Sequence, residues 1–255
     1  MNARLTAGVA VTVAMAMVVL AAVPCHAAIY YQQDFDTLTP GDINGQDGWT
    51  GNPGADVQNA VAMGGNALEA ISNNGAERPG LMGPGPRQVD FDIRLDHTTH
   101  DFTGESHRDL QINVGQMLFT GGWQYFVYKG YVVNGAVTQS RLEFRLASTV
   151  SSPDVQSDTW YHATMIFDTS KATGSSAGQA KITMSAPGNP TWWDSAWVDM
   201  GSTGPWGWQY LFRADTGIAT SVYFDNLMVR SYPVPEPASL GLLGLAGLLA
   251  LRRRR

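Results

Sequence analysis

The sequence Val-Asp-Phe-Asp-Ile-Arg-Leu-Asp at residues 89–96 decides the fold class of this chain of 255 residues. Apolar residues stand at the odd positions and charged residues at the even positions. In an extended chain the two sets point to opposite faces. This period of two predicts a β-strand with one face in a core and the other face toward water.

Similar patterns occur at residues 29–35, 110–114, 123–133, 142–146, 161–167, 180–184, 209–212 and 221–229. Asn-Gly pairs at 44–45 and 134–135 are turn signals. Sustained helical periodicity occurs only near the two ends of the chain. We therefore expect an all-β protein whose body, residues 28–232, is a single antiparallel β-sandwich.

Residues 1–27 have the layout of a secretory signal. Arg4 precedes an apolar stretch at 5–23, and small residues follow, so we expect signal peptidase to cut after Ala27 or after Ala28. Pro24 argues against lipid attachment at Cys25, because lipoprotein signals need a small residue there. Cys25 is the only cysteine, so the exported body uses neither disulfides nor cysteine chemistry.

The C-terminus, residues 233–255, has a motif, an apolar run and a basic end. The run at 238–251 would span only about 21 Å as a helix, against roughly 30 Å for the hydrocarbon core of a bilayer. The terminal arginines favour the cytoplasmic side, which leaves the body in the periplasm. We expect the run to form a short transmembrane helix, and both a plain tail anchor and a sorting signal are consistent with it.

The tail closely resembles the PEP-CTERM family, whose members combine a Pro-Glu-Pro motif, a transmembrane stretch and a terminal arginine cluster. The matching residues are Pro235, Glu236, Pro237, Arg252, Arg253, Arg254 and Arg255. The resemblance implies recognition by an exosortase, a transient stay in the inner membrane, and cleavage that sends the body to the cell surface or extracellular matrix. We therefore expect the mature protein to lack Arg252–Arg255.

The charge of the body excludes some partners. Five of the 16 basic residues and one of the 22 acidic residues lie in the two ends, which leaves the body near −10. Nucleic acids are bound through Lys and Arg contacts to phosphates, so an acidic body argues against them. An acidic body is compatible with binding a cation or a neutral glycan.

Three stretches, at residues 34–36, 158–168 and 223–229, look like the concanavalin A-like lectin/glucanase jelly rolls. The glucanases of that family carry a Glu-x-Asp-x-x-Glu strand, but none of Glu69, Glu77, Glu105 and Glu143 begins one. We therefore expect no enzyme activity, with a diverged glycoside hydrolase or polysaccharide lyase as the alternative. Asp90, Asp92 and Asp96 could form a catalytic row, but an exposed strand face balanced by Arg94 is the preferred interpretation.

The resemblance also implies a calcium ion that ties the first strand to the last, at Asp34 or Asp36 with Asp225, where hard carboxylate oxygens would bind it. Zinc is the alternative metal, at His97, His100 and His107 with Asp101 and Asp109 nearby, although a solvated loop explains that cluster as well. His162, next to Trp160, is interpreted as structural.

The tryptophans of the body are concentrated in one short region. The cluster consists of Trp192, Trp193, Trp197, Trp206 and Trp208. Tryptophan offers an apolar face with a donor edge, which suits sugar stacking, although core packing is the competing explanation. We therefore expect a surface or matrix module, either glycan-binding or structural, whose partners are exosortase, signal peptidase and extracellular polysaccharide.

Overall fold

The computed structural model describes residues 27–71, 75–79, 85–96, 107–119, 122–133, 136–173, 176–201, 209–213 and 221–232. Ala28–Tyr232 form one compact unit. The expected signal helix, the expected transmembrane helix and the whole sorting motif lie outside the described residues. Within the described ranges, no helical segment has the length and apolar character that a membrane crossing requires.

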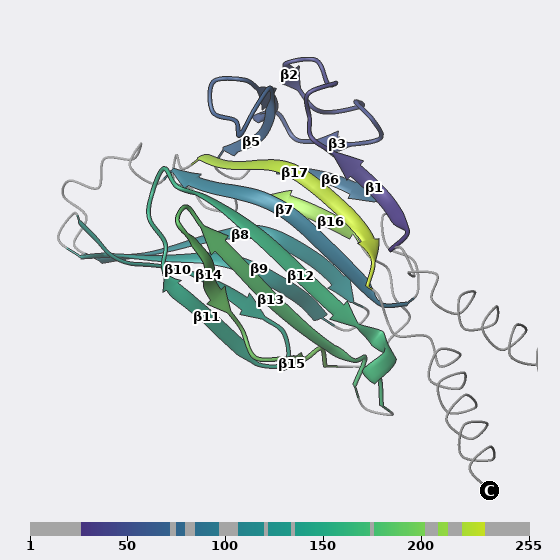
Figure 1. The fold of residues 1–255 in the computed structure, drawn as a ribbon. Coiled ribbons are helices and arrows are strands. Elements are labelled where there is room, and N and C mark those ends of the chain that lie inside the picture. Colours follow the sequence, from purple (N-terminus) through teal and green to yellow (C-terminus); the bar gives the residue numbers. More distant parts are fainter. Residues whose placement is uncertain are drawn as a thin grey trace, which may run out of the picture. The chain divides into compact units, whose positions relative to one another are not determined.

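The described chain is built from strands, with one short 3-10 turn (η1) at Thr169–Lys171, and every pairing between described strands is antiparallel (Figure 1). The first sheet contains β1 (Ile29–Gln33), β2 (Gly41–Asp42), β4 (Ala55–Gln58), β5 (Ala67–Ile71), β7 (Arg87–Asp96), β12 (Trp160–Asp168), β13 (Gln179–Ala186), β14 (Asn189–Asp194), β15 (Val198–Asp199) and β17 (Ser221–Ser231). Its order is β14-β13-β12-β7-β17-β5-β4-β2, with β1 beside β17 and β15 beside β13.

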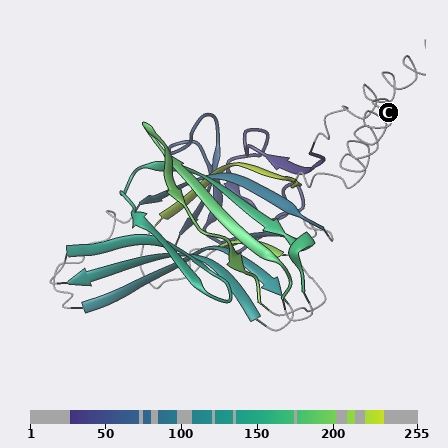
Figure 2. The ribbon, with the colours of Figure 1, turned by 60° about the horizontal axis from the view of Figure 1, so that its bottom comes forward.

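The second sheet contains β3 (Thr50–Gly51), β6 (Gly75–Pro79), β8 (His107–Phe119), β9 (Gly122–Val133), β10 (Ala136–Arg145), β11 (Thr149–Asp154) and β16 (Gln209–Arg213), in the order β11-β10-β9-β8-β16-β6-β3. The two sheets lie as two layers (Figure 2). One hydrophobic core joins them: Phe144 of β10 meets Phe167 of β12 edge to face, with ring centroids 6.2 Å apart. The all-β class and the antiparallel pairing are confirmed, whereas the concanavalin A-like topology stays a prediction.

Each strand segment expected from alternation is confirmed, with boundaries that shift by up to six residues, whereas β2 to β6, β11, β14 and β15 were not expected. The Asn134-Gly135 turn lies outside the described residues, but Val133 of β9 pairs with Ala136 of β10 on either side of it. The first strand ends at Gln33, two residues earlier than expected. Phe35 has a φ of 63°, which turns the chain out of the strand, so Asp34 and Asp36 belong to the following loop.

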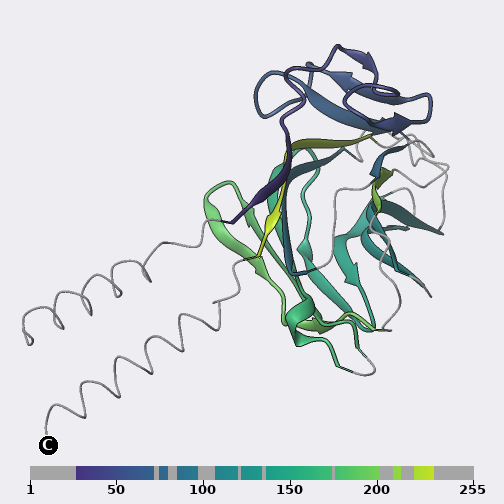
Figure 3. The same cartoon turned by 90° about the vertical axis from the view of Figure 1, so that its right-hand side faces the viewer.

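Figure 3 shows the elements of residues 34–71 gathered at one end of the two sheets. Gln46 organises the loop there: its side-chain amide donates to the carbonyls of Thr39 and Asp42 at 2.9 and 2.7 Å. Trp49 is fully buried, and its indole N–H donates to the hydroxyl of Tyr31 at 2.9 Å. The hydrogen bond from Trp49 to Tyr31 ties the loop to β1.

Strand β17 is central, because it pairs with β7 along one edge and with β1 and β5 along the other. A β-bulge interrupts the pairing with β7 between Asp225 and Met228. The extra residue, Asn226, has a φ of 51°, a left-handed conformation that Asn tolerates better than most residues.

The bulge changes which residues of β17 face the core. In a regular strand, residues at even and odd positions point to opposite faces. Yet the fully buried apolar residues of this strand are Val222 and Phe224 before the bulge, and Leu227 and Val229 after it. One extra residue shifts the alternation, so that both halves of the strand bury their apolar side chains in the same core.

We predict that Asn226→Ala destabilises the body by about 2.5–5 kcal/mol. The left-handed conformation costs an alanine about 1–2 kcal/mol. It also loses the 2.7 Å hydrogen bond that the Asn226 amide donates to buried Asp92, worth roughly 1.5–3 kcal/mol. The matched control is Asn226→Gly, which loses the same hydrogen bond without the backbone strain. Urea unfolding should therefore rank wild type above the glycine variant and the glycine variant above alanine; equal stability of the two variants would refute the strained bulge.

Candidate functional site on the polar face of the first sheet

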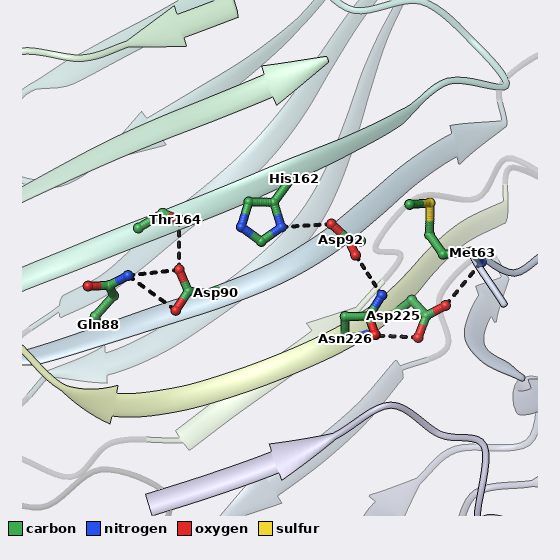
Figure 4. A network of polar contacts seen from close by, with 8 residues as sticks. All are labelled: Met63, Gln88, Asp90, Asp92, His162, Thr164, Asp225 and Asn226. Atoms are coloured by element: carbon green, nitrogen blue, oxygen red, sulfur yellow. Dashed lines mark hydrogen bonds and ion pairs between the residues drawn. The ribbon is translucent and has the colours of Figure 1, made fainter. Parts of the chain in front are cut away.

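The face of β7 that points away from the core carries a network of polar side chains (Figure 4). Its members come from three neighbouring strands, because Asp92 pairs with His162 of β12 on one side and with Asp225 of β17 on the other. Asp90 pairs with Thr164 and Met228 in the same way. Antiparallel register therefore assembles the network from segments that are far apart in sequence.

Asp92 is at the centre of this network. Nδ1 of His162 lies 2.8 Å from Oδ1 of Asp92, and because a carboxylate only accepts, this nitrogen carries the proton. The side-chain amide of Asn226 donates to the other oxygen of Asp92 at 2.7 Å. Both oxygens are thus engaged, and Asp92 is only 6% exposed.

Asp90, 7% exposed, has its own set of partners. The hydroxyl of Thr164 donates to Oδ1 at 2.7 Å, and the amide of Gln88 donates to the same oxygen at 2.8 Å. Arg230 forms an ion pair with Oδ2 at 3.1 Å. The expectation that Asp90 and Asp92 lie on an exposed face was wrong, because side chains on both neighbouring strands cover them.

The sequence predicts that Arg94 balances the charge of these carboxylates, but the structure pairs Arg94 with another residue. Its Nη2 lies 3.0 Å from Oδ1 of Asp158, the residue that precedes β12 by two positions. The cation that neutralises Asp90 is Arg230, which lies 140 residues away along the chain. Only the register of β7 with β17 brings the two together.

Asp225 lies beside the bulge and is 1% exposed. Its carboxylate accepts the backbone N–H of Met63 at 3.1 Å and that of Asn226 at 2.8 Å. Burial raises the pKa of Asp225 to about 6; the two hydrogen bonds act in the opposite direction, and the charges of Asp92 and Asp36 raise it further. This carboxyl group titrates near neutral pH because it is buried.

His162 is half-exposed, with 49% of its side chain accessible. The hydrogen bond to Asp92 raises the pKa of His162 above its usual value, although burial opposes the shift, and the charges of Asp92 and Asp90 add to it. The interpretation of His162 as structural missed this exposure. Its Nδ1 donates a hydrogen bond to Asp92, and the rest of the ring is exposed on the polar face.

Each of the three expected calcium ligands accepts a backbone N–H group. The Asp34 carboxylate accepts the backbone N–H of Asp36 at 3.1 Å, and Asp36 accepts that of Asn66 at 2.6 Å. Asp36 is near enough to Asp225 for its charge to raise the pKa of that residue. Within the described ranges, however, no three His, Cys, Asp or Glu side chains are arranged to hold a metal ion. A calcium staple stays a prediction, which melting with and without EDTA would test.

The expected zinc ligands are only partly accounted for. His107 and Asp109 lie on β8, where their backbones pair with Val133 and Tyr131 of β9. His97, His100 and Asp101 lie outside the described residues. A zinc site at this cluster therefore stays a prediction.

The described tryptophans of the cluster do not form one platform. Trp193 is 7% exposed and belongs to the core. Trp192 packs on Tyr161 near the start of β12, with ring centroids 4.6 Å apart, whereas Trp197 lies under the ammonium group of Lys171 beyond the end of that strand. Trp193 pairs with Met184 of β13 and Val198 pairs with Ala180, so the two tryptophans stand about four strand positions apart, roughly 13 Å, and contact different residues. Trp206 and Trp208 lie outside the described residues.

One partly exposed aromatic residue of the polar face was not selected from the sequence. Trp160 opens β12 and shares its outward face with His162 and Thr164, because these residues are two apart along the strand. The sequence signal that could have identified this row is the spacing of two between Trp160, His162 and Thr164 in and just before the expected strand at 161–167.

The pKa shifts predict that the body is more stable in mild acid than in mild base. Asp225 and His162 both have folded pKa values above their ordinary ones. Each therefore contributes stability that is present at low pH and is lost as pH rises through the folded pKa. For Asp225, with a folded pKa of about 6, the loss between pH 5 and pH 8 is roughly 1.4 kcal/mol.

Urea unfolding of the wild type, Asp225→Asn and His162→Gln at both pH values, in EDTA, measures the two contributions separately. Each variant should show a smaller difference between pH 5 and pH 8 than the wild type. A difference unchanged in both variants would show that neither group titrates as the structure indicates.

Comparison with solved structures found proteins of low sequence identity. Domain 4 of AbnA, an extracellular arabinanase from Geobacillus stearothermophilus in complex with arabinotriose, is 14% identical, with a TM-score of 0.48 over 85% of this chain and 98% of that chain. The receptor binding domain of botulinum neurotoxin D is 11% identical, with a TM-score of 0.47 over 86% of this chain and 53% of that chain. A sialidase is 12% identical, with a TM-score of 0.46 over 80% of this chain and 18% of that chain.

The comparison with curated proteins found no match. A family model, the PEP-CTERM protein-sorting motif, matches residues 233–255, the same segment that the sequence indicated. The motif implies an exosortase as processing partner and indicates an exported protein that is sorted through the membrane. Residues 233–255 are therefore a PEP-CTERM protein-sorting motif at the end of an all-β body.

Proposed function

We propose that the body is a non-catalytic module that binds polysaccharide at the cell surface or in the extracellular matrix. The observation that carries this proposal is the row formed by Trp160, His162 and Thr164 on the polar face of β12. An aromatic ring for stacking stands next to hydrogen-bonding groups on a strand held on both edges, by β7 and β13. Sugars are bound by this combination of apolar and polar contacts.

The state of the nearby carboxylates supports binding rather than cleavage. A glycosidase needs two carboxyl groups that face the scissile bond, one as acid and one as base or nucleophile. Asp90 and Asp92 are nearly buried, and their oxygens already accept hydrogen bonds or an ion pair from neighbouring side chains. Neither is available to a substrate without breaking those contacts.

A diverged hydrolase or lyase is the alternative, and its products distinguish it from a binding module. The purified protein is incubated with exopolysaccharide from its host. New reducing ends would indicate a hydrolase, and 4,5-unsaturated uronates would indicate a lyase. A binding module releases neither.

We predict that Trp160→Ala weakens polysaccharide binding about tenfold, which corresponds to roughly 1.4 kcal/mol, within the range expected when one stacking contact is lost. Affinity electrophoresis in gels containing host exopolysaccharide measures the effect. Met63→Ala is the control, because Met63 is 54% exposed and lies outside the row.

A second variant, Trp192→Ala with Trp197→Ala, tests the cluster that the sequence indicated. Loss of binding in this variant, with Trp160→Ala unchanged, would move the site to the tryptophan cluster. Retention of full affinity by both variants would contradict a role for Trp160, Trp192 and Trp197. If no host polysaccharide retards the wild-type protein, the body does not bind these glycans and is a purely structural module.

A further inference from the structure

The two ends of the body are fastened to each other. The backbone N–H of Ala28 donates to the hydroxyl of Ser231, and the backbone N–H of Ser231 donates to the carbonyl of Ala28, both at 2.8 Å. The N–H of Tyr232 donates to the carbonyl of Pro86 at 3.2 Å. In Figure 3, β1 and β17 run side by side at this point. The chain therefore enters and leaves the body at one place.

The sorting motif begins directly after this place. It starts at residue 233, and the apolar run starts at residue 238, six residues beyond Tyr232. Even a fully extended chain of six residues spans only about 20 Å. While the apolar run is in the membrane, the end of the body that carries Ala28 and Tyr232 is therefore held close to the lipid surface.

This end also exposes apolar and aromatic side chains. Ile29 is 57% exposed and Tyr30 is 48% exposed, and they are two of the three large apolar side chains that stand exposed in the described part of the chain. The guanidinium of Arg87 lies 4.1 Å from the centroid of the Tyr30 ring, which holds the ring in place. We call Ile29, Tyr30 and the half-buried Tyr232 the terminal patch.

We propose that the terminal patch rests in the headgroup layer of the inner membrane while the tail tethers the precursor. Tyrosine rings favour this layer, where one end of the ring meets apolar chains and the other meets water. The rest of the body, with a net charge near −10, is repelled by anionic headgroups, which makes the patch the preferred contact.

The contact is temporary, because a few side chains bury too little apolar area to hold a protein on lipid alone. It therefore orients the body before exosortase cleavage and ends with it. The inference rests on the sorting motif and is independent of polysaccharide binding, so either proposal can fail without the other.

The test uses residues 28–255, the chain that a cut after Ala27 would leave, which has no native cysteine. Single cysteines at Tyr30→Cys and Met63→Cys are labelled with a polarity-sensitive fluorophore, and each precursor is reconstituted into phosphatidylethanolamine and phosphatidylglycerol vesicles. The two positions are matched, since their native side chains are 48% and 54% exposed. We expect a blue shift and several-fold weaker quenching by an aqueous quencher at position 30, and neither effect at position 63.

Equal quenching at the two positions would overturn the proposal. Protection at position 30 that appears only after exosortase is added would also overturn it, because the patch would then bind the enzyme rather than lipid. Chain 28–232, without the tail, should show full quenching at position 30 in the same vesicles. Protection that persists without the tail would contradict the temporary contact.

Discussion

The structure depends on the bulge in β17. This strand is the junction of the first sheet, with β7 on one edge and with β1 and β5 on the other. The bulge at Asn226 lets Val222, Phe224, Leu227 and Val229 all reach the core. Each such side chain contributes roughly 1.5–3 kcal/mol when buried, so together they approach the total net stability of a typical domain, about 5–15 kcal/mol. A regular strand would leave one half of β17 with its apolar side chains on the polar face.

The same bulge builds the polar network. The left-handed conformation of Asn226 directs its amide to Asp92 and its backbone N–H to the carboxylate of Asp225. Asp92 is thereby held on its second oxygen, while His162 holds the first. The packing of β17 in the core and the hydrogen bonds that Asn226 makes to Asp92 and Asp225 thus have one cause, a single extra residue in the last strand. A change that straightened this strand would disturb both faces of the sheet at once.

The sequence predicted the nine strands in which alternation is sustained, because alternation is a local property that each segment carries by itself. It did not predict β2 to β6, β11, β14 and β15, most of which are short and owe their extended form to pairing with a neighbour. It did not predict the burial of Asp90 and Asp92, because their partners Thr164, His162 and Asn226 lie 70 to 134 residues away. The bulge was equally hidden, since Phe-Asp-Asn-Leu can be read with either alternation until the pairing with β7 is known. The tryptophans show the same limit: composition reveals their number, but only the register of β14 with β13 decides that Trp193 enters the core.

The order of elements along the chain adds a constraint on export. The strand on which the first sheet depends ends at Ser231, and the sorting motif begins at residue 233. A chain that terminates before Ser221 lacks both the central strand and the motif. A chain that carries the motif also carries all of β17. Because β17 must pair with β1, β5 and β7, the first sheet can close only when almost the entire chain is present. The position of the motif therefore restricts sorting to chains that contain every strand of the body.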